Sequence, residues 1–170
     1  FNISGERITD MMLNRFEEVA VPIYNKYAHK TKLTLDQAVI LASIIEKEAL
    51  NVSDMRTISS VFHNRLKRGM PLQSEPTVRY AVKKFSQVLT IDDLRNTSPY
   101  NTYRYNGLPI GPICNPGAAA LEAALNPDSS KFLYFVSNSD GSHSFSYTLS
   151  EHNIAVAKYK KSFQFNIPPD

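Results

Sequence analysis

The residues best suited to chemistry are two glutamates that end an apolar run, in the stretch LASIIEKEAL at residues 41 to 50. A carboxylic acid set against an apolar wall can stay protonated near neutral pH, because burial disfavours its charged form. Glu46 or Glu48 could then serve as a general acid. The same pattern also describes a helix end that emerges into water, where neither acid does any chemistry. The stretch therefore leaves two alternatives open, a catalytic acid and a solvated helix end.

The helix that carries these acids is predicted to run from Leu35 to about residue 49. Thr34 and Gln37 have the spacing of a capping box, in which the hydroxyl accepts from the backbone N–H of the glutamine. The amide side chain then bonds back to the backbone of the threonine. This pairing predicts where the helix begins, and so which way its far end points.

In that helix, Glu46 shares a face with the small side chains of Ala38, Ala42 and Ser43. Such a face could line a groove with room for a ligand. Glu48 lies about 200° round the helix axis from Glu46. The two acids therefore cannot act as a close pair, and the spacing does not choose between them.

The remaining elements follow from periodicity and turn signals. Residues 8–28 predict an amphipathic helix, and Ser53 or Asp54 is expected to cap a second helix that Gly69 ends. The prolines in residues 70–82 favour an extended, exposed segment. Asn115 and Pro116 are expected to cap a short helix that ends near residue 125, residues 131–148 read as a β-hairpin, and a last helix follows a cap at Ser150.

These elements predict one mostly helical α+β domain with a small β part. A chain of 170 residues can bury a full core, and 42% hydrophobic residues are ordinary for a globular fold. The net charge of +3 is too small to indicate nucleic acid. Cys114 is the only cysteine, so an intrachain disulfide and a zinc ribbon are excluded.

Other candidate sites are weaker. The four histidines show no metal-ligand spacing, so we expect no metal and no cofactor. Ser150, Glu151 and His152 follow one another, but adjacent residues on a helix point in different directions, and this argues against a serine hydrolase. The long proline-rich loop at residues 98–117 holds Tyr100, Tyr103 and Tyr105 beside amides and hydroxyls. Such a cluster either grips a sugar or packs on the core.

Five segments occur in the same order in the MltG (YceG-like) family of endolytic murein transglycosylases, which this chain resembles from about residue 33 to residue 160. They are LASIIEKEA, ISSVFHNRLKRGMPLQSEPTVRYA, SPYNTYRYNGLPIGPICNPG, AALEAALNP and FLYFVSNSDGSHSFSYTLSEHN. Several of these strings are long enough to be specific individually.

The resemblance implies a bacterial enzyme that cuts nascent peptidoglycan strands internally and ends their elongation. Its partners would be glycan strands and the cell-wall synthases. Residues 1–170 would form a single catalytic domain on the extracytoplasmic side of the cytoplasmic membrane. An anchor and a LysM-like region would lie upstream, and the longest apolar run here is far short of the roughly 20 residues that span a bilayer.

The resemblance also implies the site residues. The first glutamate of IIEKE, Glu46, takes the role of catalytic acid, and this breaks the tie that geometry leaves open. The substrate-binding candidates are Gln73, Glu75, Asn101 and Tyr103, because each lies in a polar, loop-borne family string. Glu75 stands where the family pattern has aspartate before Pro-Thr-Val, so either it makes the same contacts from a shifted backbone or the position tolerates change.

One acid suffices for the implied reaction. A glycoside hydrolase usually needs two carboxylates. A lytic transglycosylase instead protonates the glycosidic oxygen and then accepts the proton of the muramyl C6 hydroxyl as a 1,6-anhydro ring closes. Two rivals remain: a module that binds peptidoglycan without cutting it, which could lose Glu46, and a two-carboxylate muramidase, for which Glu75 is the candidate partner acid.

Overall fold

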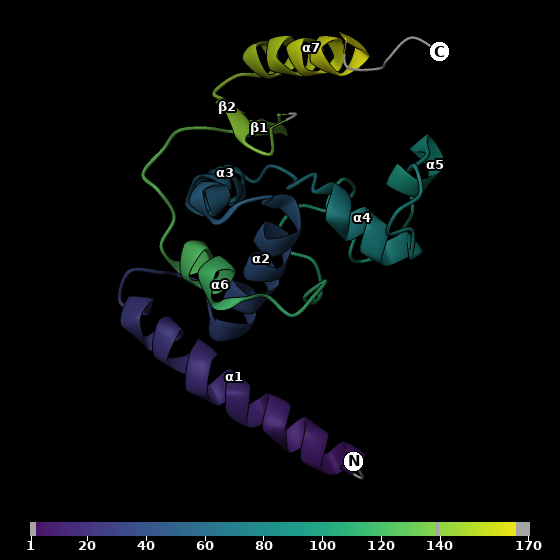
Figure 1. The fold of residues 1–170 in the computed structure, drawn as a ribbon. Coiled ribbons are helices and arrows are strands. Elements are labelled where there is room, and N and C mark those ends of the chain that lie inside the picture. Colours follow the sequence, from purple (N-terminus) through teal and green to yellow (C-terminus); the bar gives the residue numbers. More distant parts are fainter. Residues whose placement is uncertain (1–2, 139, 166–170) are drawn as a thin grey trace.

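The computed structural model describes residues 3–138 and 140–165, with side chains placed as far as residue 158. The fold is α+β, as predicted: helices surround a small core, and a two-stranded antiparallel sheet lies to one side (Figure 1). In chain order the elements are α1 Gly5–Tyr27, α2 Leu35–Glu48, the 3₁₀ turn η1 Val52–Asp54, α3 Met55–Lys67, α4 Glu75–Val82, α5 Ile91–Leu94, α6 Ala118–Leu125, β1 Tyr134–Ser137, β2 His143–Ser146 and α7 Leu149–Phe165.

The core lies where α2 packs against α3 and α6 (Figure 1). Leu41, Ile44 and Ile45 of α2 are fully buried there, together with Ile58 and Phe62 of α3. Helix α6 is almost entirely alanine and leucine, so it can approach α2 closely. The core thus holds α2 on several sides and fixes the direction of its C-terminal end, where the two glutamates lie.

The capping box at the start of α2 is confirmed. The backbone N–H of Gln37 donates to Thr34 Oγ1 at 3.3 Å, and the backbone N–H of Thr34 donates to Gln37 Oε1 at 3.0 Å. At the other end, Ala49 has extended backbone angles, so the helix ends at Glu48. Both acids therefore belong to the last turn of a helix whose start is fixed by side chains.

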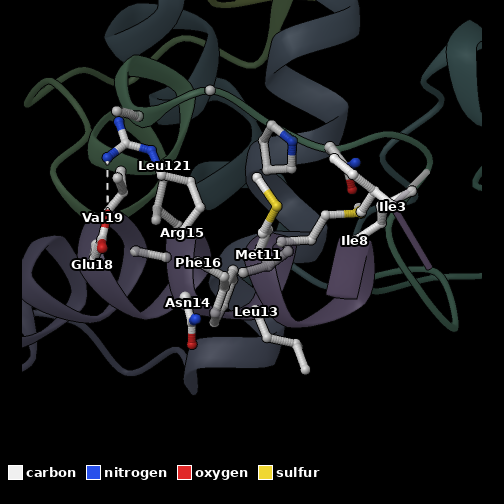
Figure 2. A pocket seen from close by; sticks show the side chains of 17 residues that line it. Ile3, Ile8, Met11, Leu13, Asn14, Arg15, Phe16, Glu18, Val19 and Leu121 are labelled. Carbon is white, nitrogen blue, oxygen red and sulfur yellow. Dashed lines mark hydrogen bonds and ion pairs between the residues drawn. The ribbon is translucent and has the colours of Figure 1, made fainter. Parts of the chain in front are cut away.

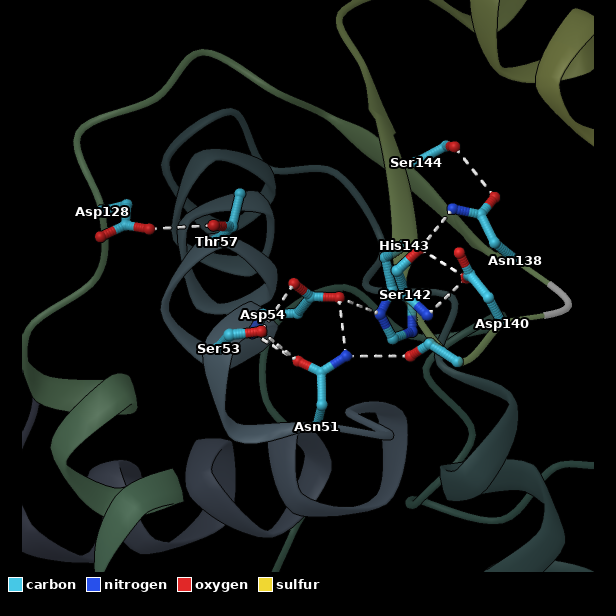
Figure 3. A network of polar contacts seen from close by, with 11 residues as sticks. Asn51, Ser53, Asp54, Thr57, Asp128, Asn138, Asp140, Ser142, His143 and Ser144 are labelled. Atoms are coloured by element: carbon cyan, nitrogen blue, oxygen red, sulfur yellow. Dashed lines mark hydrogen bonds and ion pairs between the residues drawn. The ribbon is translucent and has the colours of Figure 1, made fainter.

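Helix α3 begins directly after Asp54, one of the two predicted cap residues, but the side chain of Asp54 does not form the expected cap. Asn51 caps the short turn η1 through its side chain, and Asp54 makes no side-chain cap. The Asp54 carboxylate instead meets His143 Nδ1 of β2 at 2.8 Å, while Asn51 Nδ2 donates to the carbonyl oxygen of Gly141 at 2.9 Å (Figure 3). These contacts fasten the hairpin to the junction between α2 and α3.

The expectation of an extended, exposed segment at residues 70–82 is wrong for its second half. Helix α4 begins at Glu75, and Pro76 lies in its first turn, where a proline displaces no helical hydrogen bond. Leu72, Thr77 and Val78 are buried. Pro76 is therefore compatible with the start of a helix, whereas the prediction treated the prolines as evidence against a helix.

Two further caps differ from those predicted. Gly117 precedes α6 and provides no side-chain cap, so Asn115 and Pro116 lie one turn outside the helix. Helix α7 begins at Leu149, and the backbone N–H of Glu151 donates to Thr148 Oγ1 at 3.2 Å. Thr148 therefore caps this helix in place of Ser150.

The β-hairpin and the long loop are both confirmed. Strands β1 and β2 pair in the register Tyr134 with Ser146 and Phe135 with Phe145. Residues 98–117 contain neither helix nor strand. In the described part of the chain, no helix is both long enough and apolar enough to cross a membrane.

Candidate functional site

A polar pocket of about 360 Å³ lies between the end of α2, helix α3, the segment before α4 and the hairpin. This volume falls in the range usual for small-molecule sites, about 300–1,000 Å³. Its lining mixes ionisable and aromatic side chains: Glu48, Arg65, Leu72, Gln73, Glu75, Tyr103, Tyr134, Phe135, Val136, Ser137, Leu149 and His152.

Glu48 is the acid that this pocket holds. Its Oε1 accepts a hydrogen bond from Ser74 Oγ at 2.6 Å. Burial raises the pKa of Glu48 from its ordinary value of 4.5 to about 7, and this outweighs the hydrogen bond from Ser74, which lowers it. The charge of Glu75 adds to the rise, and that of Arg65 opposes it. Glu48 is therefore protonated in a large share of molecules at neutral pH, as a general acid must be.

Ser74 is held in place by the proline-rich loop. Its backbone N–H donates to Thr102 Oγ1 at 3.0 Å, and the backbone N–H of Gln73 donates to the carbonyl oxygen of Thr102 at 3.0 Å. Gln73 has a positive φ of 51°, which is uncommon for a residue with a side chain. Such strain persists only where the surroundings enforce it. The loop thus presents Ser74 to Glu48 and turns Gln73 into the pocket.

Arg65 forms the rear of the pocket. It is 7% exposed, and its Nε donates to the carbonyl oxygen of Leu133 at 2.7 Å. Its Nη1 donates to the carbonyl oxygens of Pro71 and Leu72 at 3.2 and 2.8 Å, and to Gln73 Oε1 at 3.3 Å. One guanidinium therefore joins α3, the segment before α4 and the residue that precedes β1.

Tyr103 and Glu75, two predicted binding residues, do line this pocket. Burial raises the pKa of Tyr103 to about 12, with a further contribution from the charges of Glu48 and Glu75, so its hydroxyl keeps its proton. Glu75 is about half exposed and pairs with Arg79 at 2.6 Å along α4. The structure therefore brings Gln73, Glu75 and Tyr103 together, and it does so around Glu48.

Asn101, the fourth predicted binding residue, is not among the residues that line the pocket. Its side chain is fully buried. Asn101 Nδ2 donates to the carbonyl oxygens of Leu94 and Asn96 at 3.0 and 2.8 Å, and Oδ1 accepts from the backbone N–H of Tyr103 at 3.0 Å. The side-chain nitrogen thus ties the loop to the end of α5 and the side-chain oxygen holds Tyr103, so Asn101 shapes the loop that carries Tyr103.

The other two tyrosines of the loop lie outside the pocket. Tyr100 packs on Tyr80 with ring centroids 4.8 Å apart, which places it against α4. Tyr105 is 45% exposed and donates to the carbonyl oxygen of Thr97. Neither lines the pocket, so of the three tyrosines only Tyr103 is placed to meet a ligand there.

Glu46 lies on the other side of α2, and its surroundings do not support the predicted groove. The small side chains of its face, Ala38, Ala42 and Ser43, are fully buried in the core. Ser43 Oγ accepts from the backbone N–H of Ile113 at 3.0 Å, and Glu46 Oε2 accepts from the backbone N–H of Gly117 at 3.0 Å. The small side chains therefore allow the chain before α6 to approach closely, and leave no room for a ligand.

The hollow that borders Gly117 is apolar. It is larger, about 1130 Å³, and lies between α1 and residues 115–118 (Figure 2). Ile8, Met11 and Phe16 of α1 line it, and Arg15 and Glu18, its ionisable residues, form an ion pair with each other at 3.3 Å. It offers no group suited to cleave a glycosidic bond.

Sequence reasoning missed Arg65, Ser74 and His152. Arg65 was detectable, because it lies one turn after Phe62 on the apolar face of α3, where a charge must find partners inside the protein. Ser74 carried no such signal. His152 was set aside with its neighbours, yet it lines the pocket while Glu151 is occupied at the start of α7.

The sequence and the fold both match a known family. Residues 2–158 match the sequence model of the YceG-like family, so the chain belongs to that family. Its similarity to individual proteins of known sequence and structure extends over most of its length.

The chain is 46% identical to an endolytic murein transglycosylase of Bacillus subtilis over 84% of its own length and 39% of that protein. It is 34% identical to one of Streptococcus pneumoniae over 92% of its length and 29% of that protein. A crystal structure of a YceG-like protein from Listeria monocytogenes superposes with a TM-score of 0.81 at 43% identity, over 89% of this chain and 49% of the other. The chain thus spans less than half the length of these relatives.

Proposed function

We propose that this chain is the catalytic region of an endolytic peptidoglycan lytic transglycosylase, with Glu48 as its general acid and base. The observation that carries the proposal is the position of Glu48 in a polar pocket that raises its pKa to about 7. The names of the relatives from Bacillus subtilis and Streptococcus pneumoniae support the same reaction. The sequence-based assignment to Glu46 is revised accordingly.

The reaction needs two proton transfers, and one carboxyl can make both. The protonated carboxyl of Glu48 gives its proton to the oxygen between N-acetylmuramic acid and N-acetylglucosamine, and the glycosidic bond breaks. The resulting carboxylate accepts the proton of the muramyl C6 hydroxyl as that oxygen attacks C1 and closes the 1,6-anhydro ring. The carboxyl is regenerated, and no water is consumed. The hydrogen bond from Ser74 stabilises the carboxylate stage and orients Oε1.

The neighbouring side chains would bind the sugars. Gln73 offers an exposed amide, and Tyr103 offers an aromatic face and a protonated hydroxyl, as sugar sites commonly do. Glu75 pairs with Arg79, is about half exposed and can accept from a sugar hydroxyl. Asn101 has no direct contact in this proposal.

A two-carboxylate muramidase is the second candidate, because Glu75 lines the same pocket as Glu48. In that mechanism Glu75 would activate water or attack C1, and the product would carry a reducing muramyl end. The Glu75 carboxylate is already paired with Arg79 at 2.6 Å, so it would have to give up this contact to attack C1 or activate water. The lytic mechanism is therefore the better supported.

The test is to digest purified peptidoglycan with the protein and to analyse the fragments by mass spectrometry. The proposal predicts 1,6-anhydromuramyl ends from the parent and none from Glu48→Gln. Reducing muramyl ends, lost in Glu75→Gln as well, would assign the muramidase mechanism. Binding to the strands without any cleavage would leave a peptidoglycan-binding module.

The setting of the reaction follows from the substrate. Nascent glycan strands lie outside the cytoplasmic membrane, so the domain would act on the extracytoplasmic side, close to the cell-wall synthases. An anchor in the membrane and a LysM-like region in the longer protein remain part of this proposal. This setting can be tested by comparing the peptidoglycan fragments from cells that carry the full-length protein with and without its anchor.

A further inference from the structure

His152 of α7 lines the pocket of Glu48 and takes no part in the mechanism above. Its imidazole stacks on the ring of Tyr134 in β1, with ring centroids 5.4 Å apart and planes inclined by 26°. The guanidinium of Arg65 lies 5.1 Å from the centroid of the same tyrosine ring. The plane of the imidazole is thus set by packing against the hairpin.

The polar atoms of this imidazole lack partners among the described residues. Nδ1 is closed off from solvent and has no hydrogen-bond partner there. Of the other histidines, His63 Nε2 meets the carbonyl oxygen of Ala124 at 2.8 Å and His143 Nδ1 meets Asp54 at 2.8 Å, although His143 Nε2 is also buried without a partner among the described residues (Figure 3). An unsatisfied buried polar group costs about 1–3 kcal/mol and is rare in native proteins. The position of His152 at the pocket suggests that a bound ligand supplies the missing hydrogen-bond partner.

The charges around His152 favour its neutral form. Burial lowers the pKa of His152, and the guanidinium of Arg65 lowers it further. A neutral imidazole carries one N–H donor and one acceptor. Sugar hydroxyls, which donate and accept, and acetamido groups, which do both through separate atoms, complement such a ring. A half-turn of the imidazole about its Cβ–Cγ bond keeps the stack on Tyr134 and moves Nδ1 to the opposite edge of the ring.

We propose that His152 is a substrate-contacting residue of the Glu48 pocket, whose neutral imidazole hydrogen-bonds to a hydroxyl or acetamido group of the bound amino sugar. The proposal deepens the function proposed above and rests on it. His152 would contribute to binding, because the proton transfers belong to Glu48.

Three substitutions separate the polar role of His152 from its packing. His152→Phe keeps a ring on Tyr134 and removes both nitrogens, His152→Gln keeps a donor and an acceptor without the ring, and His152→Ala removes both features. Each is combined with Glu48→Gln for binding to purified glycan strands, and is also tested alone for turnover. His29→Ala, on the exposed end beyond α1, is the matched control.

We expect His152→Phe and His152→Ala to weaken strand binding and to raise KM about tenfold, with kcat changed less than about threefold. His152→Gln should recover much of the affinity, and His29→Ala should match the parent. Strand binding and KM unchanged in His152→Phe would overturn the inference. So would a fall in kcat and melting temperature shared by all three variants, since that is the result of lost packing.

The two proposals fail in different ways. Full cleavage by Glu48→Gln would overturn the proposed function, whatever the histidine variants do. Loss of cleavage in Glu48→Gln, together with unchanged binding in His152→Phe, would overturn the inference about His152 and leave the function standing. No binding of strands by the Glu48→Gln protein would count against both.

Discussion

The last turn of α2 faces two different environments. On one side, Glu46 accepts a single backbone N–H from Gly117, beside a hollow lined by apolar side chains of α1 (Figure 2). On the other side, Glu48 lies in a pocket with Arg65, Tyr103 and a hydrogen bond from Ser74. The two acids are separated by one residue in the sequence and by about 200° round the helix.

This difference shows that the neighbours of a carboxyl decide its chemistry more than its place in a motif. Burial raises the pKa of Glu48 to about 7, and side chains able to hold a sugar surround it. The small residues on the face of Glu46 serve close packing in the core instead. Substitution of each acid in turn tests this difference between Glu46 and Glu48.

The largest effect is expected from Glu48→Gln. This change keeps the shape of the side chain and removes the transferable proton, and general acid–base catalysis typically contributes about 10² to 10⁴-fold. Turnover of peptidoglycan should therefore fall by at least about 10²-fold, while the melting temperature stays near that of the parent. Release of anhydromuramyl fragments, followed by liquid chromatography, measures it.

Glu46→Gln is the matched control, and it should keep most of the turnover. Its hydrogen bond from Gly117 can be retained by the amide oxygen. A large loss in Glu46→Gln with little loss in Glu48→Gln would return the catalytic role to Glu46.

The second effect is on stability as a function of pH. The folded state holds a proton on Glu48 up to about pH 7, whereas an ordinary carboxyl releases it near 4.5. The stability that the protonated Glu48 gives to the folded state is therefore fully present below about pH 4.5 and is lost as pH rises through about 7. The free energy of unfolding should fall by up to about 3 kcal/mol over that window, since tenfold in an equilibrium is worth about 1.4 kcal/mol.

Urea titrations at pH 5 and pH 8 measure this change, and Glu48→Gln should remove most of it. Glu46→Gln should leave it in place. The same slope in the parent and in Glu48→Gln would show that another group is responsible.

The third prediction contrasts Asn101 with Tyr103 in the same loop. Asn101→Ala should destabilise the fold by about 2–3 kcal/mol, because it leaves buried backbone groups without partners. Tyr103→Phe should leave the melting temperature almost unchanged and weaken turnover, because its hydroxyl lies at the pocket. Thermal unfolding and activity per folded molecule separate the two, and the reverse pattern would exchange their roles.

The smallest effect concerns the far end of α2. Loss of a helix cap usually costs about 0.5–2 kcal/mol, so Thr34→Ala with Gln37→Ala should destabilise the protein by about 1–2 kcal/mol. Turnover per folded molecule should remain near that of the parent, since the core also holds the helix. Unchanged denaturant midpoints in the double variant would show that the cap contributes nothing to stability.

Local signals in the sequence were sufficient for several elements. The Thr34 and Gln37 box, the hairpin around residues 138–142 and the irregular loop at 98–117 depend on neighbouring residues, so short-range rules predict them. Gln73, Glu75 and Tyr103 were also placed together through the strings that contain them.

The rest depended on contacts between distant residues. The choice between Glu46 and Glu48 depends on which side of α2 meets α6 and which meets residues 72–74, and periodicity within α2 does not contain that information. Asn101 was predicted to bind a ligand because it is polar and loop-borne, yet its partners in the structure are backbone groups at the end of α5 and within the loop. Asp54 was expected to cap a helix, but His143, 89 residues further along the chain, takes its carboxylate (Figure 3).

The most direct test of the central claim is a carbon-13 NMR titration of the glutamate carboxyls in the parent, Glu46→Gln and Glu48→Gln. We predict one carboxyl resonance with a midpoint near pH 7 in the parent and in Glu46→Gln, and its absence from Glu48→Gln. A resonance with that midpoint that persists in Glu48→Gln and disappears from Glu46→Gln, or a parent in which no glutamate titrates above about pH 6, would contradict the account.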